Sequence, residues 1–202
     1  MPHPIEHIKA FLSIPEELEE TMYQKITLHT FKRGDIISDM GNMRCQAYFI
    51  KSGSARTYYI LGGKEYTFSF SFEDEFIAQS IHLYKNTDMQ SGIEFLEESE
   101  VYVLPHVEMS HILDDFTHDH YKQVFAFLTT ILMEQTCRLE ERITVLQNAS
   151  APERLQWLIN RYPKILERVT LTQIASYLGV TKETLYRIRG NKYNSHPPKN
   201  DL

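Results

Sequence analysis

Residues 170–189 of the chain read TLTQIASYLGVTKETLYRIR, and this stretch decides how the C-terminal part folds. Thr170 and Gln173 have the spacing of a capping box, in which two side chains satisfy backbone groups at the start of a helix. Gly179 supplies the left-handed position at which such a helix ends. Thr181 then caps a second helix. The stretch therefore predicts two short helices joined by a tight turn.

The second of these helices has an apolar side and a basic side. Leu185 and Ile188 are spaced to anchor the helix to a core, which leaves charged residues facing outward. A helix of this kind after a tight turn is typical of a recognition helix in the major groove of DNA, although a helical hairpin within a larger fold has the same local pattern. Arg187 can pair with guanine and Glu183 with the cytosine amino group. The residues expected to contact DNA are Thr172, Thr181, Lys182, Glu183, Thr184, Arg187 and Arg189.

Charge is distributed unevenly along the chain. The net charge of the 202 residues is −6, yet residues 152–202 contain nine Lys and Arg against four Asp and Glu, a charge of +5. The rest of the chain has 12 basic and 23 acidic residues, a charge of −11. Only the C-terminal part would attract a phosphate backbone. The asymmetry indicates two modules with different partners.

Short stretches of alternating apolar residues fill the N-terminal part, up to about residue 116. Gly62-Gly63 separates two such runs and predicts a hairpin. A second hairpin is predicted from residues 92–95 and 101–104. Many short strands separated by turns favour a double-stranded β-helix, or jelly roll.

A long helix is predicted over residues 117–149, which contain neither Pro nor Gly. Apolar positions recur at alternating steps of four and three residues, which is a heptad pattern. This pattern favours a parallel homodimer seam, with a helix buried against its own β-domain as the alternative. The seam positions are Tyr121, Phe125, Leu128, Leu132, Gln135, Leu139, Arg142 and Leu146.

These segments define an α+β chain in three parts. They are a β-roll over residues 1–116, a dimerisation helix over 117–149 and a helix-turn-helix domain over 150–202. Ser150 and Glu153 form another possible capping box, which places a helix break and a hinge just after Asn148.

The order of segments, together with Thr170–Arg189, resembles the Crp/Fnr family of bacterial transcription regulators. The resemblance implies a sensor domain like the cyclic nucleotide-binding domain, a homodimer on two-fold-symmetric double-stranded DNA, and RNA polymerase as a further partner. Carried over by position, the base-contacting residues of the family fall on Lys182, Glu183 and Arg187, with Thr184 near the DNA backbone.

The effector pocket that the resemblance implies lacks its usual cation. In the matching stretch, Gln79 stands at the glutamate position and Met89 or Gln90 at the arginine position, and no arginine lies between Arg56 and Arg138. A buried phosphate without a paired cation is unfavourable, so we do not expect cyclic AMP to bind in the usual manner. The expected lining residues for an unidentified small-molecule effector are Gln79, Ser80, Gln90 and Ser91.

Other function classes are disfavoured. Cys45 and Cys137 are the only cysteines, too few for an iron–sulfur cluster, although a haem needing one histidine stays open. Catalytic motifs and the His and Glu set of a β-roll metalloenzyme are absent, so no catalytic residue, metal or cofactor is expected. Neither a signal peptide nor a stretch of about 18 apolar residues is found, which favours the cytoplasm. The alternative is a small-molecule or protein-binding module whose helix-turn-helix no longer binds DNA.

Overall fold

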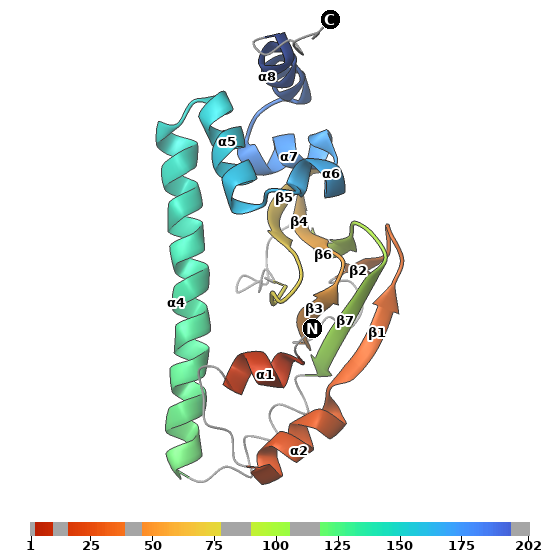
Figure 1. The fold of residues 1–202 in the computed structure, drawn as a ribbon, viewed down its shortest axis with the longest axis vertical. Coiled ribbons are helices and arrows are strands. Elements are labelled where there is room, and N and C mark those ends of the chain that lie inside the picture. The colour runs from red at the N-terminus through yellow and green to blue at the C-terminus, as the bar shows by residue number, and fades with distance from the viewer. Residues whose placement is uncertain (1–2, 10–15, 39–45, 78–89, 106–117, 195–202) are drawn as a thin grey trace, which may run out of the picture. The chain divides into compact units, whose positions relative to one another are not determined.

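The computed structural model describes residues 3–9, 16–38, 46–77, 90–105 and 118–194 (Figure 1). The chain forms two compact units, Met1–Arg138 and Leu139–Leu202, whose boundary lies inside the long helix. No helix in the described part of the chain is both long and apolar enough to cross a membrane.

The first unit contains two antiparallel sheets and two short helices. One sheet has the strand order β1-β7-β3, and the other has the order β2-β6-β4-β5. The helices are α1 (Pro4–Lys9) and α2 (Glu16–Lys25). The strands are β1 (Thr27–Phe31), β2 (Ile36–Ser38), β3 (Gln46–Ser52), β4 (Ala55–Leu61), β5 (Lys64–Ser71), β6 (Gln90–Phe95) and β7 (Ser99–Pro105).

Both sheets contribute alternate residues to one apolar core. Ile93 and Phe95 of β6 meet Val101 and Val103 of β7 in this core, and all four are buried. The ring of Phe31 stacks on Phe95 with centroids 4.1 Å apart. Because side chains alternate across a strand, this two-residue period identifies the inner face of each sheet. The β-roll predicted from alternation is confirmed.

The two predicted hairpins have different outcomes. β4 pairs with β5 across Gly62 and Gly63, so the first hairpin is confirmed. The second is wrong, because β6 pairs with β2 and β4 whereas β7 pairs with β1 and β3 in the other sheet. Between β6 and β7 the chain crosses from one sheet to the other, and the N–H of Leu96 donates to the Ser54 carbonyl at the crossing, 2.9 Å away. Turn residues end a strand, but long-range pairing decides which sheet the next strand joins.

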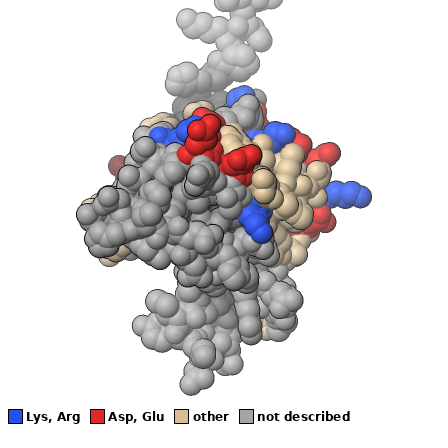
Figure 2. All heavy atoms as spheres, turned by 90° about the horizontal axis from the view of Figure 1, so that it is seen from below, with Lys and Arg blue, Asp and Glu red and all other residues tan. Residues whose placement is uncertain are grey.

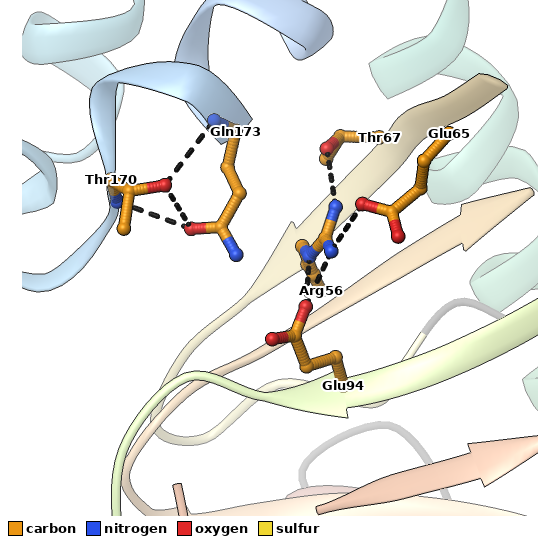
Figure 3. A network of polar contacts seen from close by, with 6 residues as sticks. All are labelled: Arg56, Glu65, Thr67, Glu94, Thr170 and Gln173. Carbon is orange, nitrogen blue, oxygen red and sulfur yellow. Dashed lines mark hydrogen bonds and ion pairs between the residues drawn. The ribbon is translucent and has the colours of Figure 1, made fainter. Parts of the chain in front are cut away.

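A buried arginine connects three adjacent strands of the second sheet. Arg56 of β4 is 6% exposed and bonds to Glu94 of β6 at 2.5 Å (Figure 3). Its other nitrogens donate to Glu65 at 2.5 Å and to Thr67 at 3.1 Å, both on β5. Arg56 is therefore fully used within the sheet.

The second unit consists of helices. The long helix α4 (His118–Asn148) agrees closely with the predicted helix over 117–149 and leads into this unit. It is followed by α5 (Ala151–Arg161), α6 (Ile165–Arg168), α7 (Leu171–Leu178) and α8 (Lys182–Asn194). The fully buried side chains of these helices are Leu158, Ile165, Ile174, Leu178 and Leu185.

Charged side chains of both signs are mixed on the face drawn in Figure 2. Lysine and arginine lie beside aspartate and glutamate there, so the described residues of that face form no patch of a single sign.

Candidate nucleic-acid interface

The first helix of the predicted motif begins at a complete capping box (Figure 3). The backbone N–H of Gln173 donates to Thr170 Oγ1 at 3.4 Å, and Gln173 Oε1 accepts from the backbone N–H of Thr170 at 3.1 Å. The Thr170 hydroxyl donates to the same oxygen at 2.8 Å. The exposed start of α7 is therefore closed by its own side chains, as predicted.

Gly179 ends α7 in the left-handed conformation, with φ 63° and ψ 34°. Its N–H reaches the carbonyls of Ala175 and Ser176, and the N–H of Val180 also donates to Ala175 at 3.0 Å. A side chain at this φ is strained, which explains the glycine. The turn is the one that the sequence predicts.

The second helix starts at Thr181, which accepts from the N–H of Thr184 at 3.2 Å. Glu183 lies in the first turn, where its own backbone N–H and the Thr181 hydroxyl lower the pKa of its carboxyl. The carboxylate is therefore charged near neutral pH and available as an acceptor.

The two sides of α8 differ as expected. Leu185 is fully buried and Ile188 is half-buried, so both face the core of the unit. Of the residues predicted to contact DNA, Thr184 is half-buried and the other six are exposed: Thr172, Thr181, Lys182, Glu183, Arg187 and Arg189. The structure thus places Lys182, Arg187 and Arg189 on one helix with their side chains in solvent, where cations can reach phosphates and base edges.

Arg154 of α5 connects the end of α7 to the end of α4 by hydrogen bonds. Its guanidinium donates to the carbonyls of Leu146 at 2.7 Å, Ala149 at 2.9 Å and Leu178 at 3.2 Å. These carbonyls lie at the C-terminal ends of α4 and α7, where no intrahelical donor is available and the helix dipole favours a cation. One side chain therefore positions three helices.

Arg142 of α4 provides a second connection. It donates to the Tyr177 carbonyl at 2.8 Å, and its guanidinium carbon lies 4.2 Å from the centre of the Tyr177 ring. Burial raises the pKa of Tyr177 to about 12. The heptad pattern assigns Arg142 to the dimer seam, and its guanidinium is engaged by α7 of its own chain.

Glu141 forms the third connection. One carboxylate oxygen accepts from Trp157 Nε1 at 2.7 Å, and the other accepts from Arg161 at 3.1 Å. The last turns of α4 therefore belong to the helical unit. Sequence reasoning missed the bonds of Arg142 and Arg154 to carbonyls near helix ends, for which the only signal is a cation close in sequence to the end of a helix.

Arg138 lies one turn before Glu141 in α4, and its contacts are with residues of the first unit. Its guanidinium donates to Glu75 at 3.1 Å and to Glu134 at 2.8 Å. The hinge predicted after Asn148 coincides with the end of α4, but the boundary between the compact units falls between Arg138 and Leu139. The break after Asn148 is bridged by the Arg154 contacts.

A stripe of exposed apolar side chains follows α4. Phe125 is 73% exposed, Leu132 66%, Leu139 39% and Ile143 51%. Steps of seven and four residues keep these positions within about 40° of one another around a helix. We call these four residues the α4 stripe. Such a run of exposed apolar residues is unfavourable in water.

The predicted effector residues are only partly described. Gln79 and Ser80 lie outside the described residues. Gln90 is exposed at the start of β6, and Ser91 is buried opposite Tyr59 of β4. Of the acidic residues before this region, Glu73 accepts from the N–H of Gly53 at 3.1 Å, and Glu75 is paired with Arg138.

Metal ligands do not gather in the described part of the chain, where no group of three or more His, Cys, Asp or Glu could hold an ion. Cys137 is a free, exposed thiol, and Cys45 lies outside the described residues. His29 of β1 is exposed and hydrogen-bonded to Thr27 at 2.9 Å.

Comparisons with known proteins agree with this architecture. The family model "Cyclic nucleotide-binding domain" matches residues 28–116. Solved structures share the fold over most of the chain. The c-di-GMP responsive global regulator CLP of Xanthomonas campestris is 12% identical, with a TM-score of 0.67 and coverage of 90% of this chain and 93% of that one.

Two further structures show the same likeness. A protein assigned to the Crp/Fnr family of transcriptional regulators from Eubacterium rectale is 18% identical, with a TM-score of 0.66 and coverage of 90% and 84%. FixK2 from Bradyrhizobium japonicum is 16% identical, with a TM-score of 0.63 and coverage of 84% and 85%. No curated protein matches the sequence. The chain therefore has the fold of Crp/Fnr regulators, and the predicted resemblance is confirmed at that level; these neighbours are regulators rather than enzymes.

Proposed function

We propose that this chain is a sequence-specific DNA-binding transcription regulator of the Crp/Fnr type that acts as a cytoplasmic homodimer. The observation that carries the proposal is the outward basic face of α8, held in place by Leu185 on its inner side. Phosphate contacts would come from Arg189 and the threonines at the helix start, and Lys182 can reach a phosphate or a base edge. Base reading would come from Arg187 and Glu183.

The homodimer rests on the α4 stripe. A second copy of the same helix, packed in parallel, would cover Phe125, Leu132, Leu139 and Ile143 against their own equivalents. A two-fold dimer presents two α8 helices, which suits a DNA site with two half-sites about one duplex turn apart. RNA polymerase is the expected further partner of such a regulator.

We propose that no cyclic nucleotide binds to this chain in the usual manner. The described acidic residues Glu73 and Glu75 precede the region, and the nearest arginine in sequence, Arg56, is fully used by Glu65 and Glu94. Because no arginine lies between Arg56 and Arg138 in the sequence, a phosphate would lack its usual arginine partner there. A neutral or weakly polar ligand near Gln79, Ser80, Gln90 and Ser91 fits this charge distribution, and the proposal needs no metal or cofactor.

To test DNA binding, the 202-residue chain is first used to select DNA duplexes from a pool of random sequences, and its affinity for the selected duplexes is then measured. Fluorescence anisotropy should show that affinity falls roughly 1000-fold between about 50 and 200 mM salt if about six phosphates are contacted. Arg187→Ala should lower the affinity for the selected site by about 5- to 150-fold and leave the affinity for unrelated DNA nearly unchanged.

Arg187→Lys is the matched control for charge. It keeps the cation but loses the planar fork, so the salt dependence should persist while the preference at the base that Arg187 contacts weakens. Failure to enrich any sequence, together with weak salt dependence, would contradict the proposal. That result would favour a ligand-binding or protein-binding module without DNA contacts.

The dimer is tested by analytical ultracentrifugation of Leu132→Asp, which should convert the dimer to monomer. Met133→Asp is the control, because Met133 is 64% exposed but lies about 100° around the helix from Leu132. Equal dissociation by both substitutions, or none by either, would contradict a seam on the α4 stripe.

A further inference from the structure

The outward face of α8 has a definable centre. The inner side is marked by fully buried Leu185 and by half-buried Thr184 and Ile188. Successive residues are about 100° apart around a helix, so the direction opposite this inner side falls between Tyr186 and Gly190. Arg187 lies about 80° from that direction. Tyr186, rather than Arg187, therefore points most directly away from the core of the unit.

Tyr186 is unusual for a central outward position. It is 55% exposed, although its ring is a large apolar group. The Lys182 ammonium lies 5.8 Å from the ring centre, within the range of a cation–π contact. This contact restricts both side chains before any ligand arrives, which lowers the entropy lost on binding. Gly190, one turn later, is exposed and adds no side chain beside the ring.

The chemistry of this face suggests what the ring meets. In the major groove, the edges of the base pairs present donors and acceptors, and thymine alone adds a methyl group. The thymine methyl group is therefore the apolar group in the major groove against which the Tyr186 ring could pack. Lys182 and Arg187 flank the ring and can take phosphate and guanine.

We propose that Tyr186 is a specificity-determining residue that reads a thymine by packing its ring against the thymine methyl group. The inference rests on the proposed function, since it requires α8 to enter the major groove. It adds a base contact beyond those expected from the charged residues. Each half-site should then contain one thymine next to the base that Arg187 contacts.

The test uses duplexes selected by the wild-type chain, in which each thymine is replaced by uracil, one at a time. Uracil lacks only the methyl group. Affinity should fall about fourfold at one position in each half-site, and about 15-fold when both half-sites are changed. Tyr186→Ala should bind thymine and uracil equally at that position. Tyr186→Phe keeps the ring and should retain the preference.

Arg187→Ala serves as the comparison, because it should lose preference at a different base and keep the thymine preference. Fluorescence of Trp157, the single tryptophan, checks that each variant is folded. An unchanged thymine-to-uracil ratio in Tyr186→Ala would overturn the inference while leaving DNA recognition by Arg187 intact. Failure of the wild-type chain to select any sequence would instead count against the proposed function itself.

Discussion

Arg154→Met should destabilise the helical unit while leaving the β-roll unaffected. The substitution keeps a long apolar side chain but removes the three donors to the carbonyls of Leu146, Ala149 and Leu178. Arg154 is half-buried, so solvent compensates for part of the loss. At about 1 kcal/mol for each hydrogen bond, the free energy of unfolding should fall by about 3 kcal/mol.

Trp157 makes this loss measurable in one unit alone. It is the single tryptophan of the chain, and it lies in α5 beside Glu141 and Tyr177. A domain of this size loses about 4–8 °C in melting temperature per kcal/mol, so its fluorescence transition should fall by about 15 °C. Thermal unfolding followed by tryptophan fluorescence gives the value directly.

Arg187→Met is the matched control, because it makes the same chemical change on the exposed side of α8. Its effect should stay within about 0.5 kcal/mol. If both variants melt at the same temperature, the Arg154 contacts do not hold the helices together and the reasoning is refuted.

Four further changes test local features. Thr170→Ala should lower the free energy of unfolding of the helical unit by about 1 kcal/mol, because α7 loses its cap. Urea unfolding followed by Trp157 fluorescence measures this loss, and Thr170→Ser should restore the cap. Gly179→Ala should lower the free energy of unfolding by about 1–2 kcal/mol. The loss would come from backbone strain alone, because the added Cβ makes only ordinary van der Waals contacts. An unchanged free energy of unfolding would contradict the left-handed turn. Arg56→Met should destabilise the β-roll by about 3 kcal/mol, measured by circular dichroism, since Glu94 and Glu65 lose their partner; an unchanged midpoint would show that the network is not stabilising. Burial raises the pKa of Tyr177 from the ordinary value of 10.0 to about 12, so the folded chain keeps the phenol proton longer than the unfolded chain does. The resulting stability is fully present below pH 10, and the free energy of unfolding should fall by about 3 kcal/mol as pH rises toward 12. Tyr177→Phe should flatten this slope, and an equally steep slope in that variant would contradict the reasoning.

Helices α7 and α8 and the turn between them could be predicted because their signals are local. Thr170, Gln173 and Gly179 act within one or two turns of backbone, and their roles follow from residue type and spacing. The alternation of the strands was readable for the same reason, since each strand buries every second side chain.

The features that the sequence did not predict involve competition between distant parts of the chain. Residues 92–95 and 101–104 have the pattern of a hairpin, but pairing with β4 and with β3 separates them into two sheets. Arg142 fits a heptad, yet its guanidinium donates to the Tyr177 carbonyl near the end of α7 in its own chain. Strand β2 has three residues and helix α6 has four, too few for a period to be read.

The contacts of Arg138 and Glu141 divide α4 between the two units. Arg138 is tied to Glu75 of the β-roll, whereas Glu141, three residues later, is tied to Trp157 and Arg161. Less than one turn of α4, about 4.5 Å, therefore lies between the residue bonded to the β-roll and the residue bonded to α5, so the boundary between the units is as narrow as three residues.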